Sequence, residues 1–133
     1  MFRSCAAVVL GYIAMTECVM IGTAGLVTLF PDYKNAEEEG TPLPLVPVIL
    51  SLAMGCLAGV AGGFVAAYLA RRARWLHAGV LALLVFVVGV VYAFLMSGGP
   101  QPGWYLALLP VTGAISIVAG GGLGSRRGKK STS

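Results

Sequence analysis

Four long apolar blocks, separated by short charged or turn-forming segments, constrain the fold of this chain more than any other feature. They cover residues 4–30, 43–70, 78–96 and 104–123. Each is at least as long as the ~17–25 residues that a helix needs to cross the hydrocarbon core of a bilayer. Only helices and closed barrels satisfy the backbone hydrogen bonds in lipid, and these blocks lack the alternation of barrel strands. The sequence therefore predicts an all-α membrane protein, with four transmembrane helices packed as an antiparallel bundle in one domain, residues 1–124.

The composition fits a lipid-exposed protein and excludes an ordinary soluble domain. Of the 133 residues, 58% are hydrophobic and 11% are charged, whereas a soluble domain carries about 25% charged residues. The net charge is +4, but the basic residues border the apolar blocks, where they suit anionic headgroups better than nucleic acid. The first block is too long for the apolar core of a signal peptide, so we expect an uncleaved span. The expected partner is the lipid bilayer, and no nucleic-acid partner is expected.

The charges between the blocks predict the orientation. Residues 31–42 carry acidic side chains, whereas basic side chains occur after the second and fourth blocks: Arg71, Arg72, Arg74, Arg126 and Arg127. Cytoplasmic segments of membrane proteins are enriched in Lys and Arg, so both termini are predicted to be cytoplasmic. Residues 31–42 then form an acidic external loop, and residues 125–133 form a basic, disordered cytoplasmic tail. We expect the five arginines to contact lipid headgroups and to fix this topology.

Glycines at helical spacing predict where helices approach each other closely. Gly55, Gly59 and Gly63 form two consecutive GxxxG steps on one face of the second block. Small residues at this spacing let two backbones pack together in a membrane. Packing inside one bundle and a homodimer contact both fit this pattern, and the sequence leaves the choice open. Gly62 is expected to add flexibility and nothing more.

Glu17 is the acidic residue that the pattern places inside a span, and it is the main candidate for a functional site. Ionisable residues within a membrane are costly and usually functional. With Thr16 and Tyr12 nearby, it forms a candidate proton or cation site. A second interpretation is a neutral acid that joins helices through a hydrogen bond to a hydroxyl group of another span: Ser51, Thr112 or Ser116. A third leaves Glu17 facing lipid, with its carboxyl group reaching toward the interface.

No set of residues indicates catalysis, a metal or a cofactor. His77 is the one histidine, and the cysteines at 5, 18 and 56 lack metal-binding spacing. A nucleophile needs a base within hydrogen-bond reach, and the sequence offers no such pair. We therefore expect a protein that is not an enzyme and that holds no cofactor.

Three stretches carry a resemblance to known proteins: RSCAAVVLGYIAMTECVMIG (Arg3 to Gly22), AGGFVAAYLARRARWLH (Ala61 to His77) and QPGWY (Gln101 to Tyr105). In these, the chain resembles an uncharacterised family of small bacterial four-span membrane proteins. The resemblance covers most of the chain and implies an architecture without an activity. A weaker likeness is to the small multidrug resistance exporters, four-span proteins with a glutamate in the first helix, which Glu17 resembles.

Three hypotheses about function follow. The first is a non-enzymatic accessory or structural membrane protein. The second is a small proton-coupled transporter with Glu17 as its intramembrane proton or cation site. The third is a membrane anchor that recruits a cytoplasmic partner through the basic 71–77 segment and the tail. A homodimer or a membrane-protein partner is compatible with each of them.

Overall fold

The computed structural model describes the backbone of residues 2–70 and 74–130, and the side chains of residues 6–70 and 75–125. The described elements are all helices: α1 (Phe2–Leu29), α2 (Pro31–Glu39), α3 (Leu45–Leu69), α4 (Arg74–Leu95) and α5 (Gly103–Lys130). Four of them contain a stretch that is long and apolar enough to cross a membrane: Ala6–Leu29, Leu45–Leu69, Trp75–Leu95 and Gly103–Ser125. The prediction of an all-α protein with four packed spans is confirmed, and the chain is a multi-pass membrane protein.

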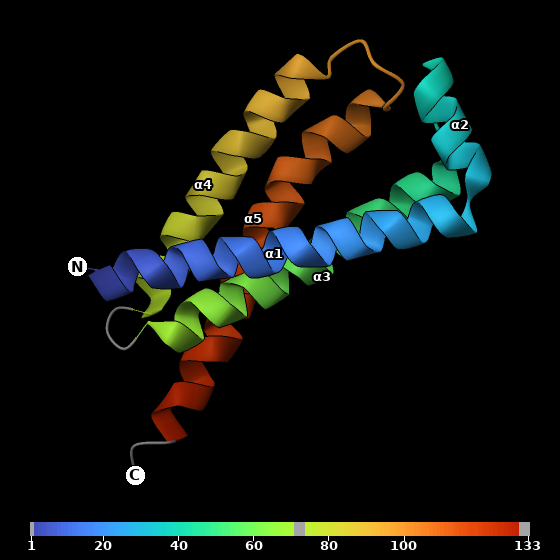
Figure 1. Cartoon of the computed structure of the whole chain (residues 1–133). Helices are drawn as coiled ribbons and strands as arrows, with labels where there is room; N and C mark the ends of the chain where they lie inside the picture. Colours follow the sequence, from blue (N-terminus) through green and yellow to red (C-terminus); the bar gives the residue numbers. More distant parts are fainter. Residues whose placement is uncertain (1, 71–73, 131–133) are drawn as a thin grey trace.

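Helix α3 organises the bundle. It packs most extensively against α5, while α1 packs on another side of α3 and α4 packs on α5. In Figure 1, α3 and α5 both run away from α2, and both ends of the chain lie on the side opposite α2. Helix α4 touches α3 much less than it touches α5, because α3 turns its glycine-rich face to α5.

The segment predicted as an acidic loop contains helix α2. Pro31 occupies the first turn, where its missing N–H group costs nothing, and Gly40 caps the helix with a left-handed φ of 67°. Tyr33 and Ala36 are buried, so one face of α2 packs against the end of the bundle. The sequence analysis missed this helix because its polar composition resembles a loop. We call this part of the molecule the α2 end.

The C-terminal segment also differs from the expectation. Residues 125–130 continue α5 as a helix, so the prediction of a disordered tail is wrong for their backbone. Lys and Arg are favourable near a helix C-terminus, where the helix dipole is negative, and their long side chains favour helix. The side chains of Arg71, Arg72, Arg74, Arg126 and Arg127 lie outside the described residues, so their contacts with headgroups stay a prediction.

Away from α2, the helices are in backbone contact, and we call this part the closed half. A Cβ atom at Gly63 would overlap the backbone carbonyl of Ile117, and one at Gly120 would overlap that of Val60. At Gly59 it would come within 2.9 Å of the Ser116 Cβ atom. Only glycine permits such approaches, which replace the hydrophobic drive that lipid removes. The buried cluster of this half consists of Ala66, Leu81, Ala82 and Ile117.

Gly62 has a larger role than we expected. A Cβ atom on it would lie 2.8 Å from the carbonyl oxygen of Gly11 and 3.0 Å from the Cβ atom of Met15. Gly62 and Gly11 therefore form the close contact between α3 and α1. Helix α3 thus presents glycine to two neighbours, which explains why two other spans pack directly on it.

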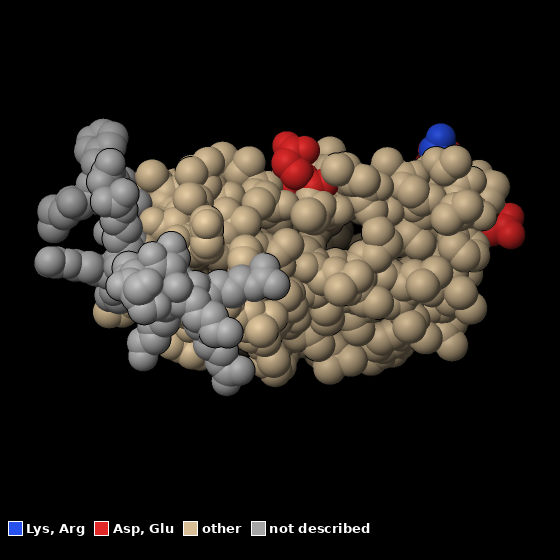
Figure 2. Space-filling model, turned by 90° about the horizontal axis from the view of Figure 1, so that it is seen from below, with Lys and Arg blue, Asp and Glu red and all other residues tan. Residues whose placement is uncertain are grey.

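The outer surface of the bundle is apolar, as a lipid-facing surface must be. Large hydrophobic side chains remain exposed on all four spans, including Ile21 at 72% and Phe94 at 77%. Figure 2 shows one long face with few charges outside its ends. A soluble monomer rarely exposes apolar area of this extent, so lipid is the solvent that the surface fits.

Candidate functional site

A cavity of about 400 Å³ lies between the four spans at the α2 end. Its volume is within the ~300–1,000 Å³ of typical small-molecule sites. All four spans contribute to its apolar wall, mainly through Met15, Val19, Met54, Val88 and Leu109. Figure 2 shows a hollow among uncharged residues near the middle of the same face.

The absence of side chains at two glycines opens the cavity. A Cβ atom at Gly55 would meet nothing within 4 Å, and one at Gly113 would meet only the Val85 Cγ1 atom at 3.6 Å. Both residues line the cavity. Gly55 therefore does not join Gly59 and Gly63 in the contact with α5, although it shares their spacing. Gly59 and Gly63 pack against α5 inside the bundle, whereas Gly55 lines the cavity.

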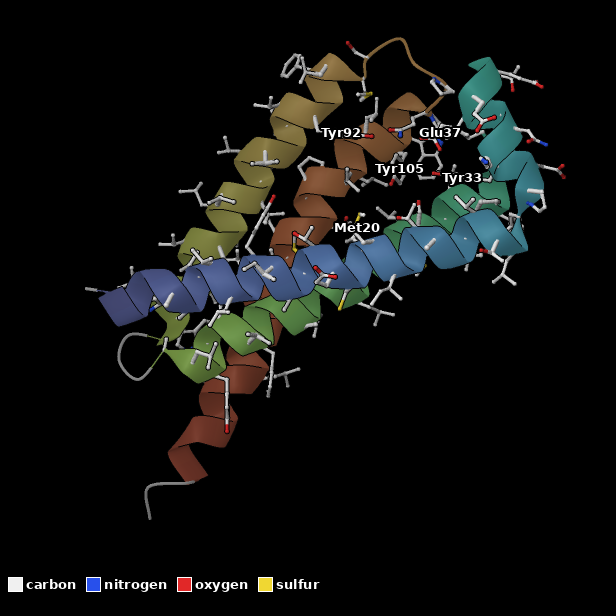
Figure 3. All side chains as sticks on the ribbon, in the orientation of Figure 1. Met20, Tyr33, Glu37, Tyr92 and Tyr105 are labelled. Carbon is white, nitrogen blue, oxygen red and sulfur yellow. The ribbon has the colours of Figure 1, made fainter. Side chains whose placement is uncertain are left out.

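Polar side chains gather at the end of the cavity nearest α2. Tyr33 and Glu37 come from α2, Tyr92 from α4, and Tyr105 from the start of α5. Figure 3 shows these four side chains together between α2 and the adjoining ends of α4 and α5. Tyr33 is buried, whereas Glu37 is exposed and lies at the rim. The cavity therefore has an apolar interior and a polar rim.

A pair of hydrogen bonds holds this rim. Gln101 Nε2 donates to the Tyr92 hydroxyl group at 3.0 Å, and Ser51 Oγ is hydrogen-bonded to the Tyr105 hydroxyl group at 3.3 Å. Among the described side chains, Gln101 Oε1 is buried and has no hydrogen-bond partner. A buried acceptor without a donor costs about 1–3 kcal/mol. The rim thus contains an acceptor that a ligand with a donor group would satisfy.

The charge at the rim is negative. Lys34 pairs with Glu38 along α2 at 3.5 Å, with both side chains well exposed. Within the described part of the chain, Glu37 has no such partner. Burial raises the pKa of Tyr33 above its ordinary value of 10.0, and the negative charge of Glu37 raises it further. Glu37 is therefore close enough to act electrostatically on a side chain in the cavity.

Glu17 lies elsewhere. It is exposed on α1, and the cavity is lined by the other side of that helix, at Met15, Val19 and Thr23. The interpretation that places it facing lipid fits this position.

The polar neighbours expected for Glu17 are engaged elsewhere. The hydroxyl groups of Ser51, Thr112 and Ser116 donate to backbone carbonyl oxygens of their own helices at 2.8, 2.8 and 2.6 Å. None of the hydrogen bonds of the described side chains joins Glu17 to one of these hydroxyl groups. Thr16 donates to the carbonyl oxygen of Tyr12 at 2.9 Å, and both side chains are exposed beside Glu17.

The residues of the cavity rim did not emerge from the sequence analysis. Tyr33 and Tyr105 lie near span ends, where tyrosines commonly anchor a helix at the membrane interface, but both line the cavity. One signal was present: Tyr33, Tyr92, Gln101 and Tyr105 all lie near span ends that topology brings to one side of the membrane. Tyrosines near span ends on one side, as three of the five are here, indicate either an interface belt or a shared site.

Among the described side chains, those of residues 6–70 and 75–125, no three from His, Cys, Asp or Glu come together as a metal ion would require. Comparisons with known proteins gave no match, whether to protein families, to curated proteins or to solved structures.

Proposed function

We propose that this multi-pass membrane protein binds a small amphipathic molecule in the cavity at the α2 end, as a non-enzymatic accessory protein of a bacterial inner membrane. The observation that carries the proposal is the asymmetry of the cavity, with apolar walls inside and the rim of Tyr33, Glu37, Gln101 and Tyr105. Ligand sites combine mostly apolar walls with a few convergent polar groups in this way.

The charge distribution supports a direction of access. If basic segments face the cytoplasm, as the positive-inside rule implies, the α2 end faces the exterior. The ligand would then enter beside α2 from the external side or from the outer leaflet. Both termini would be cytoplasmic.

On this proposal, ligand binding does not involve Glu17, the residue on which the transporter hypothesis depends. Glu17 lies on the lipid-facing side of α1 and has no place in ligand binding. An exposed carboxyl group in a span still favours a role outside the cavity. Recruitment of a partner by the basic 71–77 segment and the tail stays a separate prediction.

Photolabelling with a short-chain alcohol that carries a diazirine tests the proposal on the purified protein in lipid nanodiscs. The label should map by mass spectrometry to the cavity faces of α1, α3 and α5. Gly55→Leu should abolish this labelling, because its side chain would enter space that is empty at Gly55.

Leu57→Ala is the matched control, since Leu57 is on the same helix and 71% exposed. It should leave labelling of the cavity unchanged. Labelling confined to lipid-facing residues, or insensitive to Gly55→Leu in a variant that still folds, would contradict the proposal.

A further inference from the structure

The distribution of polar groups implies a ligand with one polar end. The deeper wall contains Met15, Val19, Leu52, Met54 and Val85, which offer no strong hydrogen-bonding group. The rim beside α2 holds hydroxyl groups, an amide and a carboxylate. A molecule that fills the cavity therefore places an apolar body among the methionines and its head group beside α2.

The hydrogen-bond inventory of the rim favours a head group that donates. Gln101 uses an amide hydrogen on Tyr92, which leaves the oxygen of the same amide buried and without a donor. That side chain forms only this one hydrogen bond among the described residues. Its oxygen can therefore turn toward a donor that enters the cavity, and an acceptor-only head group would leave it unsatisfied.

The electrostatics of the rim favour a cation. Glu37 lines the cavity, and the basic residue of the same helix, Lys34, is paired with Glu38. The rings of Tyr33, Tyr92 and Tyr105 stand around the same space, and aromatic faces attract cations. A cation with N–H groups satisfies both the carboxylate and the amide oxygen, whereas a quaternary ammonium group cannot donate to either.

We infer that the cavity selects amphipathic molecules whose head group is a protonated primary amine, held by the Glu37 carboxylate and the Gln101 amide oxygen. This inference rests on the proposed function. Hydrogen bonds to charged groups contribute about 1.5–3 kcal/mol, so the amine should bind about tenfold or more tightly than an uncharged analogue of equal length.

Competition against the photoactivatable alcohol tests the inference. The competitors are an n-alkylamine and the alcohol, carboxylate and trimethylammonium compounds of the same chain length. They are added at neutral pH to nanodiscs of zwitterionic lipid, and each concentration is corrected for measured partitioning into the lipid. The amine should block cavity labelling at about one tenth of the concentration that the alcohol or the trimethylammonium compound requires.

Variants then assign this preference to residues. Glu37→Gln and Gln101→Leu should each remove most of the amine's advantage, and Gln101→Glu should retain it, because a carboxylate still accepts. Glu39→Gln is the matched control, since it removes a charge from the same helix at an exposed residue that does not line the cavity and leaves the pair of Lys34 and Glu38 intact.

The outcomes separate the two proposals. If the alcohol labels the cavity and the amine competes no better than the trimethylammonium compound, the inference fails while the proposed function stands. An equal loss in Glu39→Gln and Glu37→Gln would also overturn the inference, because surface charge would then explain the preference. If the alcohol never labels the cavity, the proposed function itself fails.

Discussion

The two halves of this bundle use glycine for opposite purposes. In the closed half, Gly63 and Gly120 bring α3 and α5 into backbone contact. At the α2 end, Gly55 belongs to the same GxxxG series, yet empty space surrounds it. One turn of α3 separates Gly55 from Gly59, and the helices diverge over that distance. A small-residue motif therefore predicts that a close approach is permitted, and the partner helix decides whether it occurs.

The largest expected difference between the halves is in the stability lost when a large apolar side chain is replaced by alanine. Ile117→Ala should lower the free energy of unfolding by about 2–5 kcal/mol, because it leaves a cavity in a fully packed site. Leu109→Ala, two turns earlier on α5, only enlarges an existing cavity and should cost clearly less. Unfolding of both variants in mixed micelles gives the two values. Equal costs would mean that the halves are packed alike.

Glycine substitutions should show the next largest difference. Gly63→Ala and Gly120→Ala should each destabilise the protein by roughly 1–3 kcal/mol, because the new methyl group would overlap a backbone carbonyl on the facing helix. Gly55→Ala adds the same methyl group in open space and should be neutral or slightly stabilising. Thermal unfolding midpoints of the three variants compare them directly. A lower midpoint for Gly55→Ala would contradict the open space beside Gly55.

A smaller effect is expected from the hydrogen bond between α3 and α5 at the rim. Tyr105→Phe removes the hydroxyl group that bonds to Ser51, which should cost about 0.5–1.5 kcal/mol. Tyr12→Phe, at an exposed tyrosine of α1, is the control and should change stability less. The measurement is again unfolding in mixed micelles, and equal effects would show that the rim bond adds nothing.

The smallest effect concerns pH. The pKa of Tyr33 is raised in the folded protein, first by burial and then by Glu37. Packing of neutral Tyr33 therefore stabilises α2 fully below the ordinary tyrosine pKa of about 10, and this contribution is lost as the pH rises through the raised value. Ultraviolet titration should show a late-ionising tyrosine component that becomes smaller in Tyr33→Phe. In Glu37→Gln the pKa of Tyr33 should fall part of the way back. An unchanged pKa of Tyr33 in Glu37→Gln would contradict the electrostatic contact between the two side chains.

The sequence predicted the spans well because lipid imposes length and composition directly. Four long apolar runs, of which only the first contains a charged residue, admit few other structures, and the observed spans differ from the predicted ones by only a few residues at most ends. The α2 helix was missed because a polar helix that caps a bundle has no such signal. Its stability comes from Tyr33 and Ala36, whose burial depends on the other helices.

The candidate site was predicted less well, for a physical reason. Glu17 is conspicuous in sequence because a carboxyl group in a span is costly, but this cost does not say which way the side chain points. Tyr33, Gln101 and Tyr105 are unremarkable individually and form a rim only after four segments meet. The depth of a cavity depends on how far two helices diverge, which no local pattern encodes.

Cysteine accessibility on one helix tests the difference between the halves most directly. Thr112 lines the cavity, whereas Ser116, one turn further along α5, is buried with 8% exposed. With the native cysteines at 5, 18 and 56 replaced, Thr112→Cys and Ser116→Cys are treated in nanodiscs with a small polar thiol reagent. We predict that Thr112→Cys reacts, that Ser116→Cys does not, and that Gly55→Leu protects Thr112→Cys. Equal reactivity at the two positions would contradict a bundle that is hollow at the α2 end and closed at the other.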